Sequence, residues 1–140
     1  MNDVAINKAQ SIQRAVRRAR EEYQADPGNF ASNTTRQDAA LLNVVRACET
    51  AIDLANHIIR VRKLGIPVST ADTFELLQAA GIIDGRMAER LKKMVGFRNT
   101  VVHQYTKVDL AIVEAVIATE LNELLAFSDK ILEQVMGPSS

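Results

Sequence analysis

Residues 41–59 read LLNVVRACETAIDLANHII, a stretch with a long and regular apolar pattern. Its apolar side chains recur three, four and seven positions apart, which places them on one face of an α-helix. Leu42 and Leu54 widen that face, as is typical of a helix covered on two sides in a bundle or at a dimer interface. The periodic positions are Leu41, Val44, Val45, Cys48, Ile52, Ala55, Ile58 and Ile59. The sequence therefore predicts a long, largely buried helix.

Signals at both ends extend this helix from about residue 34 to residue 63. Thr34-x-x-Gln37 and Thr35-x-x-Asp38 both have the spacing of a capping box, which satisfies free backbone N–H groups at a helix start. Gly65-Ile66-Pro67 then stops the helix.

Four more helices are predicted from the same periodicity and from turn signals. They span about residues 3–24, 69–81, 84–103 and 106–135, and Thr106-x-x-Asp109 reads as the capping box of the last one. We expect an all-α fold, an antiparallel bundle of four main helices with one additional short helix. Residues 1–136 would form a single domain, and residues 137–140 a flexible tail.

Composition narrows the class of protein. The chain has 140 residues, 47% of them hydrophobic, which suits one modest core and excludes disorder for most of the length. Cys48 is the only cysteine, so no internal disulfide or thiol-based metal cluster can form, and we interpret it as a core residue. No run of about 18 apolar residues and no signal pattern is present, so we expect a cytoplasmic protein without a membrane partner.

Formal net charge is zero, but the charges are unevenly placed. Residues 84–107 carry six Lys or Arg against two Asp or Glu, whereas residues 109–140 carry six acidic residues and one Lys. The first segment presents a positive field to a phosphate-bearing ligand, or it is a solvated face that neighbouring acids neutralise, and charge alone favours neither interpretation.

A second basic stripe lies on the first predicted helix and consists of Arg14, Arg17 and Arg18. Because Arg17 and Arg18 stand four residues before Glu21 and Glu22, surface ion pairs are expected. The sequence thus favours a solvated face over a track for RNA.

The residues best suited to catalysis are found in residues 98–105, RNTVVHQY, near the end of a predicted helix. Asn99 and His103 are four apart, so the amide can orient the imidazole. Arg98 and His103 are five apart, about 140° around the helix axis, and do not share a face. The helix could loosen, the arginine could bend round, or a second copy could complete the site. We favour a twofold dimer, with both motifs facing one cleft.

Such groups suit phosphoryl transfer in which RNA supplies a 2′-hydroxyl as its own nucleophile. One imidazole takes the hydroxyl proton and another protonates the leaving oxygen, while Arg98 stabilises the charged phosphorane. This chemistry requires no metal and no cofactor. From residue types alone, the alternative is an arginine and a histidine packed at a helix crossing. His57, the other histidine, is adequately explained as a polar position near a helix end.

Residues 98–105 resemble the R-N-x-x-x-H-x-Y signature of the HepT-like toxins, a branch of the HEPN superfamily. Residues 1–4, 46–53 and 92–97 are also similar, so the resemblance covers essentially the whole chain. It implies a HEPN-type four-helix bundle, a homodimer, and a metal-independent endoribonuclease. This enzyme would be the toxin of a bacterial type VII-like toxin–antitoxin pair.

The resemblance also implies residue roles. Arg98 and His103 would be the catalytic pair, and Asn99 the polar residue that follows the arginine. Tyr105 would receive AMP from ATP, transferred by a partner antitoxin, an MntA-type minimal nucleotidyltransferase. The added charge and bulk would then repel RNA phosphates.

Two acids on the long helix are candidates for a supporting role. Glu49 and Asp53 are four residues apart, so both can face the motif across the bundle, or they can be plain surface acids or partners of Arg46. The resemblance slightly favours a supporting role in orienting Arg98.

Two other functions remain open from the sequence. The chain could be a non-catalytic HEPN dimer that binds nucleotide, RNA or a nucleotidyltransferase partner. It could also be a plain structural dimer, in which Tyr105 has no role.

Overall fold

The computed structural model describes residues 2–136, and all regular elements in this range are helical. They are α1 (Asn2–Gln24), a 3₁₀ turn (Pro27–Ser32), α2 (Thr34–Arg62), α3 (Thr70–Ala79), α4 (Gly85–His103), a 3₁₀ turn (Tyr105–Lys107), α5 (Leu110–Ala115), a π-helical turn (Val116–Glu120) and α6 (Leu121–Met136). The predicted all-α class is confirmed. The tail predicted at residues 137–140 lies outside the described residues.

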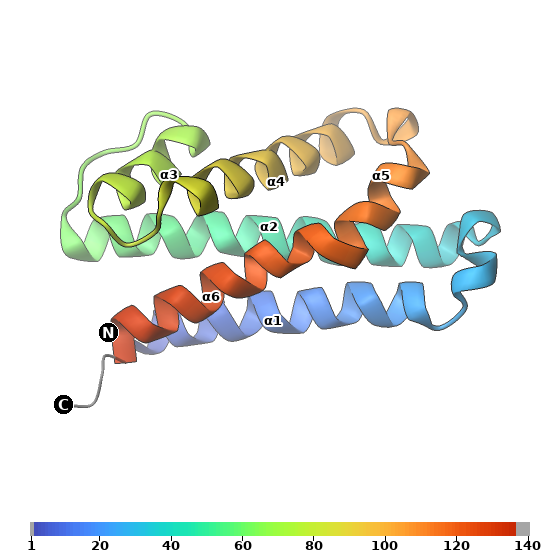
Figure 1. The fold of residues 1–140 in the computed structure, drawn as a ribbon, viewed down its shortest axis with the longest axis horizontal. Coiled ribbons are helices and arrows are strands. Elements are labelled where there is room, and N and C mark those ends of the chain that lie inside the picture. The colour runs from blue at the N-terminus through green and yellow to red at the C-terminus, as the bar shows by residue number, and fades with distance from the viewer. Residues whose placement is uncertain (1, 137–140) are drawn as a thin grey trace.

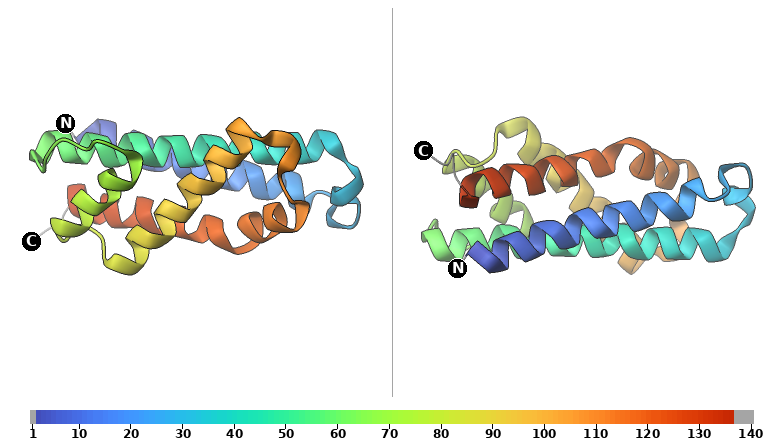
Figure 2. Two further views of the ribbon diagram at one scale, coloured as in Figure 1. Left: turned by 90° about the horizontal axis from the view of Figure 1, so that it is seen from above. Right: turned by 90° about the horizontal axis from the view of Figure 1, so that it is seen from below.

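The long helices α1 and α2 run antiparallel and side by side along the whole molecule (Figure 1). Helix α6 packs on α1, and α4 crosses α2 obliquely on another side, as Figure 2 shows from above and below. The short helix α3 fills the space between α2 and α4 at one end. This arrangement is the predicted bundle of four main helices with one short helix, and its core includes Ile12, Leu54, Leu91, Leu121 and Phe127. No helix in residues 2–136 is long and apolar enough to cross a lipid bilayer.

The predicted apolar face of α2 is buried, or half-buried at Val45 and Ile52, but the two residues that widen it differ. Leu54 is fully buried, whereas Leu42 is 50% exposed. In a single chain, therefore, one side of α2 near residue 42 is exposed to solvent, although the apolar pattern predicts that it is buried.

The helix starts predicted near residues 34, 69 and 84 are confirmed, and the start predicted at residue 106 is wrong. Ser69 and Asp84 cap α3 and α4, as each accepts a hydrogen bond from the backbone N–H three residues on. Helix α2, however, is capped by Asn33, whose side chain accepts from the backbone N–H of Arg36 at 3.1 Å. Asn33 competes successfully with Thr34 and Thr35 because it has an extended backbone and asparagine is a stronger cap.

The last helix starts later than predicted, at Leu110, and its cap is Asp109, whose carboxylate accepts from the backbone N–H of Ala111 at 2.9 Å. Thr106 lies in the preceding 3₁₀ turn and does not cap the helix. As a result, residues 105–107 form a separate turn that carries Tyr105 off the axis of α4.

The predicted last helix is also interrupted by the π-helical turn Val116–Glu120. Arg20 of α1 binds this turn: its Nε donates to the carbonyl oxygen of Ile117 at 3.0 Å, and its Nη2 donates to Oδ1 of Asn122 at 2.7 Å. The guanidinium thus connects α1 to the segment where the backbone hydrogen bonds change from the α-helical to the π-helical pattern.

Replacing Arg20 by methionine is expected to lower the free energy of unfolding by about 1–3 kcal/mol, since a part-buried carbonyl loses a charged donor. Urea denaturation followed by circular dichroism measures this change. Arg86→Met is the matched control, because Arg86 is exposed and makes no hydrogen bond or ion pair within residues 2–136. Equal unfolding midpoints for the two variants would contradict the role of Arg20.

Candidate functional site

Helix α4 carries the motif toward its C-terminal end and directs Arg98 at α2. The Nη2 of Arg98 donates to a carboxylate oxygen of Glu49 at 2.7 Å, and Nη1 donates to Oδ1 of Asn99 at 2.8 Å. The side chain of Arg98 is only 26% exposed, so this ion pair is partly shielded from water. Its Nε is buried and has no hydrogen-bond partner within residues 2–136. The two terminal nitrogens of the guanidinium are therefore held in place by hydrogen bonds, whereas its Nε–H donor has no described acceptor.

Of the two candidate supporting acids, the structure brings one to the motif. Glu49 contacts Arg98. Asp53 is exposed and makes no hydrogen bond or ion pair within the described part of the chain. Asn99 binds Arg98, whereas the sequence suggested that its amide would orient His103.

His103 is the last residue of α4, and its side chain is exposed. It makes no hydrogen bond or ion pair with any described residue. Because α4 stays helical through His103 and Arg98 points to Glu49, neither a loosened helix nor a bent arginine brings the two together. Within one chain, therefore, the pair lies on different faces of α4.

Tyr105 lies in the 3₁₀ turn after α4 and is 46% exposed. Its hydroxyl donates a hydrogen bond to the carboxylate of Asp38 on α2. Asp38 and Glu49 are eleven residues apart, which is three helical turns, so they share one face of α2 about 16 Å apart. One face of α2 therefore anchors both ends of the motif through its acids.

Apolar side chains are exposed beside these anchors. Leu42, on the same face of α2 as Asp38, is 50% exposed, and Val102, next to His103, is 49% exposed. Together with the ring of Tyr105 they give the motif an apolar border, here called the motif border.

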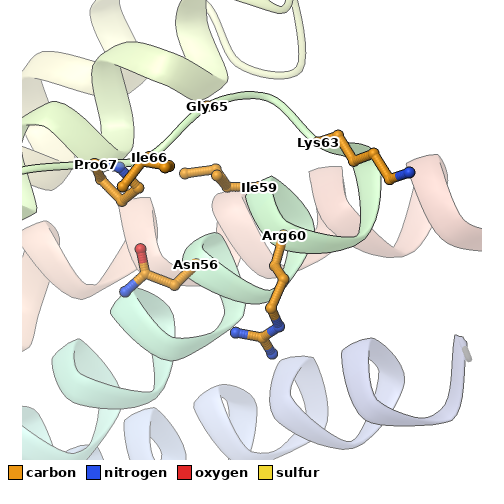
Figure 3. Close-up of a pocket in the computed structure, with 7 residues that line it drawn as sticks. All are labelled: Asn56, Ile59, Arg60, Lys63, Gly65, Ile66 and Pro67. Atoms are coloured by element: carbon orange, nitrogen blue, oxygen red, sulfur yellow. The ribbon is translucent and has the colours of Figure 1, made fainter.

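The largest hollow described on the surface lies elsewhere. It has a volume of about 640 Å³ and is formed by the last turns of α2 and the linker that follows, with Asn56, Arg60 and Ile66 among its lining residues (Figure 3). Four smaller hollows are also described, and none of the five is lined by Arg98 or His103. Among residues 2–136, no three His, Cys, Asp or Glu side chains are grouped closely enough to hold a metal ion.

Cys48 lies beneath the Arg98 anchor, and its thiol donates weakly to the carbonyl oxygen of Met94 at 3.7 Å. Burial raises the pKa of this thiol to about 12, although the nearby Arg98 charge opposes the shift. A thiol held neutral in this way is a poor nucleophile, so the interpretation of Cys48 as a core residue is confirmed.

His57 is buried near the other end of α2, where Nη2 of Arg60 lies 3.5 Å from its Nδ1. Burial lowers the pKa of His57, and the positive charge of Arg60 lowers it further. The structure therefore places His57 far from the motif along α2 and favours its neutral form.

The pKa of His57 predicts a pH dependence of stability. As pH falls below about 7, the unfolded chain takes up the proton first, because its histidine has the ordinary pKa of about 6.5. Stability is thus present above that pH and is lost as pH falls through the lowered folded-state pKa. Urea denaturation at a series of pH values should show a shallower decline for His57→Gln than for wild type. Parallel declines would contradict this assignment.

Comparisons with known proteins fit this geometry. A family model described as ribonuclease HepT-like matches residues 12–131. An mRNA nuclease HepT from Shewanella oneidensis is 43% identical over 131 residues, which cover 94% of this chain and 98% of that protein.

Two solved structures are also similar. The tri-AMPylated Shewanella oneidensis HEPN toxin in complex with MNT antitoxin has a TM-score of 0.88 at 43% identity, covering 94% of this chain and 98% of that one. A toxin–antitoxin structure with AMP-PNP has a TM-score of 0.87 at 41% identity, covering 94% and 99%. The predicted HEPN-type fold is therefore confirmed.

Proposed function

The chain belongs to the ribonuclease HepT-like family, and from this premise we propose that it is the toxin of a bacterial type VII-like toxin–antitoxin pair. Its activity is metal-independent endoribonuclease cleavage in the cytoplasm, carried by a single HEPN domain of residues 1–136. The observation that supports this most is the end of α4, where Arg98 is fixed by Glu49 and an unpaired His103 faces solvent.

The working unit is a homodimer. Arg98 and His103 lie on different faces of α4, so one chain alone does not place them around one phosphate. The motif border of Leu42, Val102 and Tyr105 supplies exposed apolar surface next to the motif, and a second copy would cover it. A twofold axis there would bring two imidazoles and two guanidiniums to one cleft.

The reaction follows from these groups. One His103 imidazole accepts the proton of a ribose 2′-hydroxyl, and the oxygen attacks the adjacent phosphorus. The bond from phosphorus to the 5′-oxygen breaks, and the second His103 gives that oxygen a proton. Arg98 donates to the phosphorane oxygens as their charge builds. The products are a 2′,3′-cyclic phosphate and a 5′-hydroxyl.

Glu49 acts in this scheme as a positioning residue, through Arg98. Glu49→Gln keeps the shape of the side chain but removes its charge, so kcat should fall about tenfold while KM stays unchanged or decreases. Asp53→Asn is the matched control, one turn further along the same helix with no described partner. Steady-state cleavage of a fluorogenic RNA measures both variants. Equal losses in kcat would argue against the Glu49–Arg98 contact.

Regulation acts on Tyr105, to which an MntA-type minimal nucleotidyltransferase antitoxin transfers AMP. The hydroxyl is on an exposed turn, and its one described partner is Asp38. A phosphodiester on this oxygen replaces the donor with negative charge beside a carboxylate, so the turn loses its attachment to α2. The added charge also repels RNA from the cleft.

Bacterial growth tests this proposal. Induction of the wild-type chain should stop growth, whereas Arg98→Ala and His103→Ala should allow it. Equal inhibition by all three would contradict the catalytic assignment. Purified wild-type protein that binds RNA but never cleaves it would instead indicate a non-catalytic HEPN dimer.

A further inference from the structure

A second basic feature lies between α1 and α2. It is a groove of about 430 Å³ with Arg14, Arg17 and Arg18 on the α1 wall and Arg46 on the α2 wall. We call it the arginine groove. The sequence favoured a solvated face for the α1 arginines, but it gave no sign that Arg46 stands opposite them.

The hollow exists because its floor is made of short side chains. Ala15 and Asn43 are both buried there, and neither reaches outward to fill the space between the arginine walls. The side-chain amide of Asn43 turns back to donate to the carbonyl oxygen of Ala39 at 2.9 Å. The floor is therefore fixed, and the groove stays open to solvent.

The charges in the arginine groove are poorly neutralised. The expected pair between Arg18 and Glu22 is not formed, because Glu22 binds Arg36 at 3.2 Å. Arg18 and Arg46 make no hydrogen bond or ion pair within residues 2–136.

The other two arginines retain most of their charge as well. Arg14 bonds only to the neutral hydroxyl of Ser11, at 2.8 Å. Arg17 and Glu21 are 3.8 Å apart and both more than half exposed, so this pair is weak. No acidic side chain lines the groove. Four guanidiniums thus gather in a chain whose net charge is zero.

The arginine groove is also close to the motif. Arg46 precedes Glu49, the anchor of Arg98, by three residues on α2, which is about 4.5 Å along the helix axis. A strand lying in the groove and passing over α2 at Arg46 would reach the position of Arg98.

We propose that the arginine groove binds the sugar-phosphate backbone of single-stranded RNA beside the phosphate that is cleaved. This inference rests on the proposed function, because it assumes that the chain acts on RNA. Guanidinium forks match phosphate oxygens, and Ser11 and Thr50 in the same groove add hydroxyl donors. None of the exposed large hydrophobic side chains lines the groove, so its surface fits a phosphate chain better than a protein partner.

The test measures binding apart from cleavage. The probe is a fluorescein-labelled single-stranded RNA with 2′-fluoro riboses, which has no nucleophile for the proposed reaction. Fluorescence anisotropy gives its Kd for the wild-type protein and for Arg18→Gln/Arg46→Gln across a range of salt concentrations. Arg86→Gln/Lys130→Gln removes two charges from surface sites outside the groove and is the matched control.

We expect the groove variant to bind roughly tenfold more weakly than the control, with the slope of log K against log salt reduced by about 1.4. Arg18→Lys/Arg46→Lys should restore that slope, which a merely structural defect would not allow.

Equal Kd values for groove and control variants would overturn the inference. So would unchanged RNA binding together with loss of nucleotidyltransferase binding, since that result assigns the groove to a protein partner. Cleavage of natural RNA by wild-type protein is measured in parallel. If the wild-type protein does not cleave natural RNA, the proposed function is contradicted. The Kd values still show whether the arginine groove binds RNA.

Discussion

His103→Ala is expected to slow RNA cleavage about 10²–10⁴-fold, the usual contribution of a positioned acid or base. The imidazole is exposed and makes no described hydrogen bond or ion pair, so its removal leaves no buried polar group unsatisfied. Stability should therefore change by no more than about 0.5 kcal/mol. A loss of cleavage rate of this size, with the free energy of unfolding unchanged, would show that His103 acts in the cleavage reaction and not in folding.

Single-turnover cleavage of end-labelled RNA in the presence of EDTA measures this rate. His57→Gln is the control, because His57 is the other histidine and lies away from the motif along α2. It should cleave at a rate near that of wild type. A His103→Ala rate within a few-fold of wild type, or equal losses from both histidine variants, would remove His103 from the mechanism.

Tyr105→Phe should abolish neutralisation by the antitoxin while leaving the toxin active. The substitution removes only the hydroxyl oxygen, which is the acceptor of AMP in the proposed regulation. The hydrogen bond to Asp38 is lost as well, but it is exposed and should contribute about 1 kcal/mol at most. Cells that co-express the antitoxin should grow with the wild-type toxin and stop growing with the variant.

Intact-protein mass spectrometry after co-expression follows the modification itself. Wild type should gain the mass of one or more AMP groups, and Tyr105→Phe should gain none. Tyr23→Phe is the matched control, since Tyr23 is the other tyrosine, and its hydroxyl lies in a part-buried position on α1, 3.5 Å from Glu114. AMP found on the Tyr105→Phe protein, or growth rescued without it, would place the regulation at another residue.

The sequence predicted the bundle well because the apolar periodicity within each helix identifies its buried face, and capping residues and turn residues mark most helix ends. The spacing of apolar residues identified α2 and the other long helices, and Ser69 and Asp84 marked two starts correctly. The cap of α2 was assigned to a threonine instead of the preceding Asn33, and the last helix was started at Thr106, three residues before its cap Asp109, because threonine is itself a favoured cap residue. Only the backbone at each residue decides between such candidates.

Features that depend on distant residues were not predictable in this way. The π-helical turn after α5 is stabilised by Arg20, 97 residues away from Ile117. The choice of Glu49 over Asp53 as the partner of Arg98 depends on how α4 crosses α2, which periodicity does not encode. For the same reason, the pairing of Glu22 with Arg36 and the groove that Arg46 completes emerged only from the packed helices.

Mixed dimers test whether two protomers share one cleft. A dimer with one wild-type and one His103→Ala protomer, isolated through two different affinity tags, has a single imidazole at the seam. Since the proposed reaction needs one imidazole as base and the other as acid, its cleavage rate should fall at least about tenfold, to a tenth of the wild-type rate or less. A mixed dimer that keeps half of the wild-type rate would show that each protomer cleaves alone, and would contradict a shared cleft.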